Sequence, residues 1–164
     1  MSKQMVFGIG FVVVIGLVFV LFGGGDQQIA PQAQAHEAVV YREATCGCCS
    51  QYVAYLKRKG YEVDDRVVSN INEIKAQHMI PQEMMSCHTT MIDGYVIEGH
   101  MPLEVIEKLL AERPEDLRGI ALPGMPSGSP GMPGAKQGSF QIHGLMYDSI
   151  EGGRVGMMRE FMRF

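Results

Sequence analysis

The chain has 164 residues and a formal net charge of −4, so after an N-terminal segment is set aside it has the length of one ordinary domain and no room for a second. The acidic balance and the lack of an arginine-rich run exclude a nucleic-acid-binding protein. Thirteen methionines and no tryptophan are an unusual composition; core filling is their usual role, but the thioether is also a soft metal ligand. We expect a small partner.

The N-terminal segment is apolar from Met5 to Phe22, follows a single basic residue, Lys3, and ends in glycines. This pattern predicts that residues 1–25 are a signal peptide or, because the run is about 18 residues long, an uncleaved membrane anchor. A buried core helix suits this position poorly. The lone leading charge places the rest of the chain outside the cytoplasm, with the N-terminal segment in at least transient contact with the membrane.

Residues 26–37 are rich in Gln, Ala and Pro and are predicted to be a linker. The domain proper, residues 38–118, begins with an apolar strand at 38–41 that leads into Cys46-Gly47-Cys48-Cys49. Helical spacing follows from Cys49 until Gly60 ends the helix. The cysteines therefore lie at a strand-to-helix junction, where the helix N-terminus favours thiolate, which is both a nucleophile and a metal ligand.

The following elements alternate in type. We expect a strand at 61–68, a helix at 70–78 capped by Asn70, a hairpin of strands 89–92 and 95–98, and a helix that begins at Pro102 and closes before Pro114. This order is that of the thioredoxin fold, and Cys46 and Cys49 have its C-x-x-C spacing. The predicted class is therefore α/β and thioredoxin-like, with a mixed central sheet and flanking helices. Such a fold brings Cys87, in the loop before the hairpin, beside the other three cysteines.

The C-terminal third has two predicted parts. Residues 119–139 are predicted to form a Gly/Pro/Met loop from which we expect no core strand; its Met125 and Met132 can supply thioethers to a soft metal ion, although packing on an apolar surface is the simpler interpretation. Residues 140–164 are predicted to be a hairpin extension that packs on the same domain. Its methionines form a soft patch or cover the sheet edge: Met157, Met158 and Met162.

Four segments together carry a resemblance to a known family. They are Thr45 to Cys49, Ser86 to Thr89, Gly94 to Pro102, and the two runs Leu122 to Pro126 and Gly128 to Met132. In these residues the chain resembles the CopG-like family of exported thioredoxin-like proteins of bacterial copper resistance, formerly a domain of unknown function. The resemblance covers about Val39 to Met132. It implies a periplasmic domain, among other copper-handling proteins, that binds copper at the cysteines and has copper or thiol redox activity.

One departure from the family is Tyr52, where relatives often carry tryptophan. The position remains aromatic.

The residue chemistry agrees with copper, because Cu(I) is soft and prefers thiolate and thioether ligands. We predict a metal site on four sulfurs, with a multinuclear copper cluster as its natural content: Cys46, Cys48, Cys49 and Cys87. Zinc is the chief rival, but the adjacent Cys48 and Cys49 strain a tetrahedral site. His88 is a candidate ligand, although strand alternation would turn it away from Cys87. His100 is expected at the surface, with a supporting role or ligation as the alternative.

Other interpretations remain open. The four cysteines can form two structural disulfides in a membrane-tethered adaptor. Alternatively, Cys46 is the nucleophile of a thiol-disulfide oxidoreductase, with Cys49 or Cys87 resolving. The chain has no G-x-S-x-G, phosphate-binding glycine loop or H-E-x-x-H, so hydrolase and nucleotide chemistry find no support.

Overall fold

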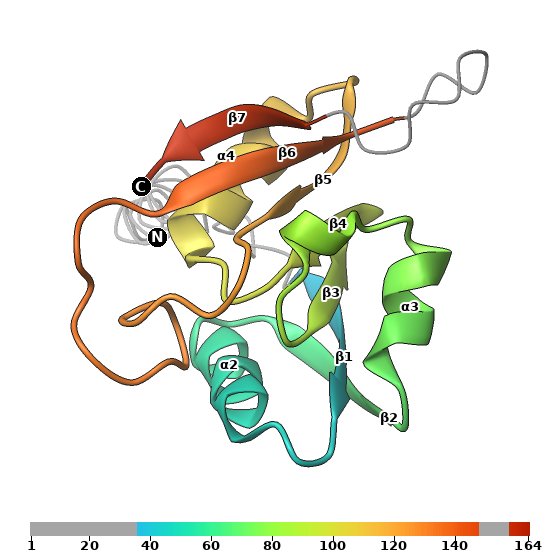
Figure 1. The fold of residues 1–164 in the computed structure, drawn as a ribbon, viewed down its shortest axis with the longest axis vertical. Helices are drawn as coiled ribbons and strands as arrows, with labels where there is room; N and C mark the ends of the chain where they lie inside the picture. Colours follow the sequence, from blue (N-terminus) through green and yellow to red (C-terminus); the bar gives the residue numbers. More distant parts are fainter. Residues whose placement is uncertain (1–35, 148–157) are drawn as a thin grey trace, which may run out of the picture. The chain divides into compact units, whose positions relative to one another are not determined.

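The computed structural model describes residues 36–147 and 158–164, and within them one mixed sheet and three α-helices (Figure 1). The strands are β1 (Glu37–Glu43), β2 (Glu62–Val68), β3 (Thr89–Ile92), β4 (Tyr95–Glu98), β5 (Leu117–Ala121), β6 (Gln141–Met146) and β7 (Met158–Arg163). The helices are α2 (Gly47–Arg58), α3 (Ile71–Gln77) and α4 (Leu103–Glu112), with a short 3-10 turn η1 (Gln82–Met84). The predicted α/β class with a mixed sheet is confirmed.

The sheet has the order β2-β1-β3-β4-β5-β6-β7. β1 pairs with β2 in parallel and with β3 antiparallel; β3 and β4 form the predicted hairpin, and β4 runs parallel to β5. β6 and β7 pair antiparallel, as predicted for the tail. Because β1 and β3 are neighbours, the loops at their adjoining ends lie together, and these loops carry the cysteines.

Local sequence signals explain where the elements begin and end. The Asn70 side chain accepts a hydrogen bond from Asn72 N at 3.1 Å and caps α3. Asp93 and Gly94 both have positive φ, at 48° and 84°, as a tight two-residue hairpin turn requires. Gly60, at φ 92°, follows α2, as predicted.

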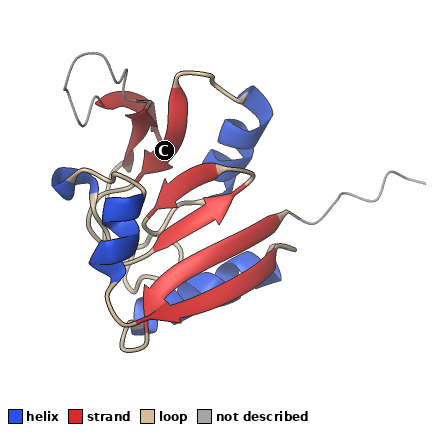
Figure 2. Cartoon of the chain, turned by 90° about the vertical axis from the view of Figure 1, so that its right-hand side faces the viewer, coloured by secondary structure: helices blue, strands red, loops and turns tan. Residues whose placement is uncertain are grey.

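Helices cover both faces of the sheet (Figure 2). On one face α2 and α4 enclose the larger apolar cluster, to which β4 contributes Ile97. On the other face Ile80 and Met84, which follow α3, pack against Val96 and Leu145. Val96 and Ile97 point to opposite faces, as strand alternation requires.

Strand β5 corrects the prediction that residues 119–139 contribute to no core strand, because Gly119, Ile120 and Ala121 belong to β5. All five residues of β5 are buried, and the strand extends two residues past Gly119. The sequence hides it because Arg118 and Gly119 interrupt the apolar run. Arg118 is tolerated because its guanidinium donates to the carbonyls of His78, Met79 and Met146. At Gly119 a Cβ would lie 2.0 Å from Val96 O, so the neighbouring strand admits only glycine.

Helix α4 begins at a proline that offers no side-chain cap, and α2 supplies the missing acceptor. The Tyr55 hydroxyl accepts from Leu103 N at 2.9 Å. We expect Tyr55→Phe to lower the free energy of unfolding by about 1 kcal/mol, measured by urea denaturation. Tyr95→Phe is the control, since the Tyr95 hydroxyl has no hydrogen-bond partner among the described residues; equal losses in the two variants would contradict the capping role.

Two predictions lie partly or wholly outside the described residues. The signal or anchor at 1–25 lies outside the described residues, and so does Met157 of the predicted hairpin extension. Among residues 36–147 and 158–164 no helix is long and apolar enough to cross a membrane. Met162 is half-buried and packs against the core cluster, which fits the simpler interpretation of a covered sheet edge.

Candidate metal centre

All four cysteines converge at one end of α2. Cys46 is the N-cap of this helix, Cys48 and Cys49 lie in its first turn, and Cys87 lies in the loop before β3. The Sγ atoms of Cys46 and Cys48 are 3.4 Å apart, and those of Cys48 and Cys87 are 3.9 Å apart. One ligand atom from each of the four cysteines lies within 4.8 Å of the others. The predicted return of Cys87 to the cluster is therefore seen in the structure.

The sulfurs are in two chemical states. Cys46 and Cys49 form a disulfide, and Cys48 and Cys87 are free thiols. The interpretation of two structural disulfides is therefore wrong: the fold brings Cys48 and Cys87 close, but it leaves them unbonded.

Two histidines complete the centre. Cys87 Sγ lies 2.9 Å from His100 Nε2 and 3.4 Å from His88 Nδ1. A second set of side chains able to share a metal ion therefore exists: Cys49, Cys87, His88 and His100. Two expectations are corrected. Cys87 and His88 precede β3 and are not bound by strand alternation, so both face the centre. His100 is fully buried, because Gly99, at φ 84°, turns the chain after β4 back toward the cysteines.

The hydrogen bonding of His100 defines its tautomer. Nδ1 lies 2.7 Å from Pro130 O, a group that only accepts, so Nδ1 carries the proton. The lone pair of Nε2 therefore faces Cys87. Histidines that bind metals usually donate their other ring N–H to a carbonyl or carboxylate in this way.

Burial sets the charges in the centre. Burial, with the neighbouring His100 and Lys75, holds the pKa of His88 well below its ordinary value, and burial lowers the pKa of His100. Both imidazoles are therefore neutral and can donate a lone pair. Burial, together with the nearby Cys48, raises the pKa of Cys87 to about 12, so this thiol keeps its proton near neutral pH.

The inner wall of the centre is aromatic. The Tyr52 ring lies 4.4 Å from the His88 ring and 5.5 Å from the His100 ring, centroid to centroid, and the two histidine rings meet edge to face at 4.7 Å. The Tyr52 hydroxyl donates to Met101 O at 3.1 Å. Tyr52 thus packs against both histidine rings and restricts their orientation. The sequence indicated only that this position is aromatic.

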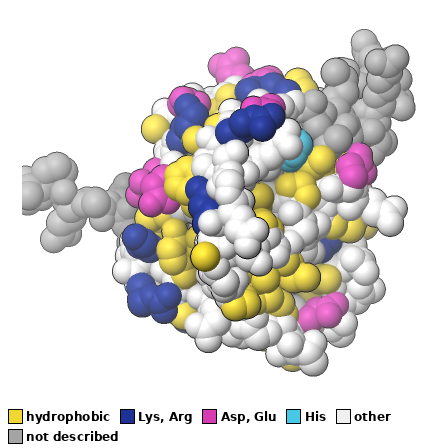
Figure 3. Space-filling view, turned by 60° about the vertical axis from the view of Figure 1, so that its left-hand side comes forward, with side chains coloured by type: hydrophobic (Ala, Val, Ile, Leu, Met, Phe, Trp, Pro, Cys, Tyr) yellow, Lys and Arg dark blue, Asp and Glu magenta, His cyan; other side chains and the backbone are white. Residues whose placement is uncertain are grey.

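Of the two candidate methionines, one lies near the cysteines. Met132, half-buried, lines a pocket of about 460 Å³ that also contains Cys48, Gln51 and Arg58. Gly131 packs so tightly on α2 that a Cβ there would lie 2.8 Å from Tyr52 N. Met125 is 55 % exposed and does not line this pocket. Figure 3 shows the face of the molecule toward which the loop of residues 119–139 lies, with hydrophobic side chains gathered on the lower half of that face.

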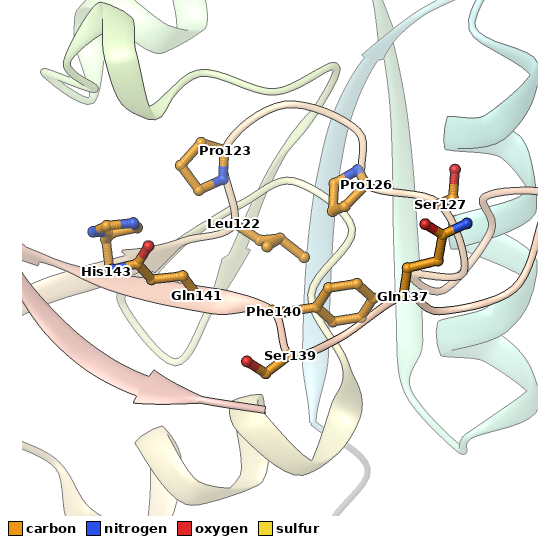
Figure 4. Close-up of a pocket in the computed structure, with 9 residues that line it drawn as sticks. All are labelled: Leu122, Pro123, Pro126, Ser127, Gln137, Ser139, Phe140, Gln141 and His143. Atoms are coloured by element: carbon orange, nitrogen blue, oxygen red, sulfur yellow. The ribbon is translucent and has the colours of Figure 1, made fainter.

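A second pocket of about 460 Å³ lies between the loop and β6, and none of the cysteines lines it (Figure 4). Its polar groups come mainly from amide and hydroxyl side chains, with His143 at one end. A single imidazole among neutral side chains is not a soft-metal site. The pocket beside Cys48 is therefore the one that bears on metal chemistry.

A charged pair that the sequence patterns did not predict lies next to the centre. Lys75 of α3 and Glu98 of β4 form an ion pair with side-chain exposures of 2 % and 0 %. The available signal was a carboxylate at the end of the otherwise apolar strand 95–98, a place where an unpaired charge would not be tolerated.

Comparisons with known proteins agree on one family. Residues 84–132, less than half of the chain, match the family model described as protein of unknown function, DUF411. No curated protein matches. Two solved structures, forms 2 and 1 of the copper resistance protein CopG, are each 37 % identical to the chain, with TM-scores of 0.69 and 0.68. Each match covers 80 % of this chain, and 99 % and 98 % of the respective CopG chains. At this identity and coverage, the chain belongs to the CopG family of copper resistance proteins.

Proposed function

We propose that the chain is a periplasmic copper-binding protein of copper resistance that holds Cu(I) on Cys46, Cys48, Cys49 and Cys87. The observation that carries the proposal is the convergence of four sulfur ligands within 4.8 Å of one another. Thiolate sulfur selects Cu(I) over hard ions, and closely spaced thiolates can bridge several metal ions. A multinuclear cluster is therefore the proposed form of the bound copper.

His100 and His88 are the proposed nitrogen ligands. His100 has the stronger support, because Pro130 O accepts from its Nδ1 and leaves Nε2 directed at Cys87. His88 Nδ1 also faces Cys87, and its Nε2 is buried with no hydrogen-bond partner among the residues that the structure describes. Both rings are neutral, which is the form that binds metals.

Loading of all four sulfurs requires that the Cys46–Cys49 disulfide be reduced. Two electrons and two protons convert the disulfide to two thiols, and Cu(I) then displaces protons from them. In the oxidised chain Cys48, Cys87 and the two histidines remain as ligands. We therefore propose that the oxidation state of the pair sets how many copper ions the centre holds.

The thioredoxin-like assignment supports the same function. The sheet order β2-β1-β3-β4, with α2 following β1 directly, is the arrangement expected of that fold. The apolar segment at the N-terminus supports export, followed by release or by anchoring to the inner membrane, and other periplasmic copper-handling proteins are the proposed partners. Met132, at the pocket beside Cys48, is the proposed first contact for arriving copper, with Met125 farther out on the same loop.

Copper loading tests the proposal. Reduced protein, titrated with Cu(I) without oxygen, is expected to retain more than one copper per chain by elemental analysis, and Cys48→Ser is expected to retain fewer. Ser50→Ala is the matched control on the same helix, because the Ser50 hydroxyl donates to the backbone carbonyl of Cys46 and its described hydrogen bond reaches no sulfur or ring nitrogen of the proposed ligands. Less than one tightly bound copper in wild type, or zinc retained in preference to copper, would contradict the proposal.

One observation favours a second function. The Cys46–Cys49 pair at the N-terminus of α2 is suited to thiol-disulfide exchange. Once a dithiol has reduced the pair, Cys46 thiolate attacks a substrate disulfide and releases one substrate thiol; Cys49 then attacks the mixed disulfide, releases the second substrate thiol and re-forms the Cys46–Cys49 bond. An insulin-reduction assay with dithiothreitol as reductant tests this. A dedicated oxidoreductase requires Cys46 and Cys49 but not Cys48; a rate equal to that of dithiothreitol alone eliminates it.

A further inference from the structure

The ion pair of Lys75 and Glu98 lies directly behind the segment that carries Cys87. Both side chains are withdrawn from solvent, and burial of two charges is expensive even when they are paired. Apolar residues of similar volume often stabilise a fold as well or better. Stability alone therefore does not account for a charged pair here, and the contacts of the carboxylate indicate what does.

Every described hydrogen-bond partner of the Glu98 carboxylate other than Lys75 flanks the Cys87-His88 dipeptide. Glu98 Oε1 accepts from Ser86 N at 2.6 Å and from the Lys75 ammonium. Glu98 Oε2 accepts from the Thr89 hydroxyl at 2.7 Å, and Lys75 also donates to this hydroxyl oxygen, at 3.3 Å. One carboxylate therefore holds the residue before Cys87 and the residue after His88.

Two further bonds join this segment to the chain that leads to His100 and to the loop after β5. His88 O accepts from Gly99 N at 3.1 Å, and the Ser86 hydroxyl donates to Gly124 O. Ser86 precedes β3, so its N–H takes no part in the sheet ladder. Glu98 is its acceptor, and loss of the carboxylate would release the segment at the point next to Cys87.

We propose that Glu98, with its charge balanced by Lys75, is a positioning residue that fixes Cys87 for copper. This inference rests on the proposed function. Glu98 touches none of the proposed ligands; it acts through Ser86 and Thr89, which set the position of Cys87 relative to Cys48 and His100. Residues that orient metal ligands in this way commonly change metal affinity by about 10–100-fold.

Glu98→Gln is the test. Glutamine keeps the volume, but its single oxygen cannot accept on both sides of the dipeptide, and Lys75 loses its counter-charge. We expect Cu(I) affinity, measured by competition with a chromophoric chelator, to fall about tenfold or more. A metal-free readout uses the Cys48→Ser background, where Cys87 is the only free thiol of the oxidised chain. There the rate of Cys87 alkylation is expected to change several-fold on Glu98→Gln.

Two further variants separate positioning from loss of stability. Arg118→Gln disturbs another buried charge, whose described hydrogen bonds go to His78, Met79 and Met146, and is expected to lower the unfolding temperature without changing either readout. Thr89→Val keeps the shape and removes one donor to Glu98, and should shift both readouts less, in the same direction; it replaces Glu98→Gln if that variant does not fold. A folded Glu98→Gln, or Thr89→Val in its place, that matches the parent protein in both readouts overturns the inference. Failure of wild type to bind copper overturns the proposed function instead, and the alkylation rate still reports on positioning.

Discussion

Replacing Cys87 with serine is expected to cost more copper affinity than any other single cysteine replacement. Cys87 is the free thiol that belongs both to the group of four cysteines and to the second group of side chains able to share a metal ion. Its Sγ contacts Cys48, His88 and His100. Serine oxygen is a hard, weak ligand for Cu(I). We expect a loss of more than about 100-fold, because even residues that only orient ligands contribute about 10–100-fold. Chelator competition under anaerobic conditions measures it.

The pH dependence provides a second readout of Cys87→Ser. With the pKa of Cys87 raised to about 12, the thiol is protonated in the metal-free protein near neutral pH, and copper must displace that proton. Affinity of wild type should therefore rise with pH, by about tenfold per unit for each proton released. The variant should lose one proton from this dependence. Cys48→Ser is the control, and we expect it to lose less Cu(I) affinity than Cys87→Ser. An equal loss in the two variants would contradict the prediction that Cys87 contributes more than the other cysteines.

The location of the candidate metal centre could be predicted from short-range patterns together with one fold assignment. The strand-to-helix junction, the Asn70 cap and the Asp93-Gly94 turn are local signals, and the structure confirms them. The convergence of Cys87 on Cys48 required the element order, since these residues are 39 positions apart. A sequence pattern can predict that two distant residues are in contact only when a known fold indicates how their segments are placed in space.

The features that the sequence did not predict correctly all depend on contacts between segments far apart in the chain. His100 is buried because Gly99 turns the chain inward and Pro130 accepts from its ring, neither of which periodicity reveals. Strand β5 contains an arginine whose acceptors come from the end of α3 and from β6. Lys75 belongs to a helix where lysine is ordinarily exposed, and only the position of Glu98 explains its burial. In each case a polar residue is buried because a partner far along the chain satisfies it.

Gly99→Ala is expected to destabilise the protein and loosen the centre together. Gly99 has φ 84°, and a Cβ there would lie 2.5 Å from Leu122 O and 2.8 Å from Ser86 Cβ. The backbone conformation alone costs an L-residue about 1–3 kcal/mol. Crowding adds to this, because both neighbours belong to segments that the centre uses, so we expect a total of about 4 kcal/mol or more. Urea denaturation measures the loss, and Cu(I) competition on the folded fraction measures the centre.

Gly94→Ala is a matched control for the backbone term. Gly94 also has φ 84°, but a Cβ there would meet nothing within 4 Å. It should therefore lose only the conformational part, about 1–3 kcal/mol, and keep its copper affinity, because the hairpin turn lies at the far end of β4 from His100. The difference between the two variants isolates the crowding at Gly99. Gly99→Ala and Gly94→Ala could instead lose equal free energy of unfolding and both keep full Cu(I) affinity. The contact of Gly99 with Ser86 and Leu122 would then not hold the centre in place, and the hydrogen bonds of Glu98 would have to do so alone.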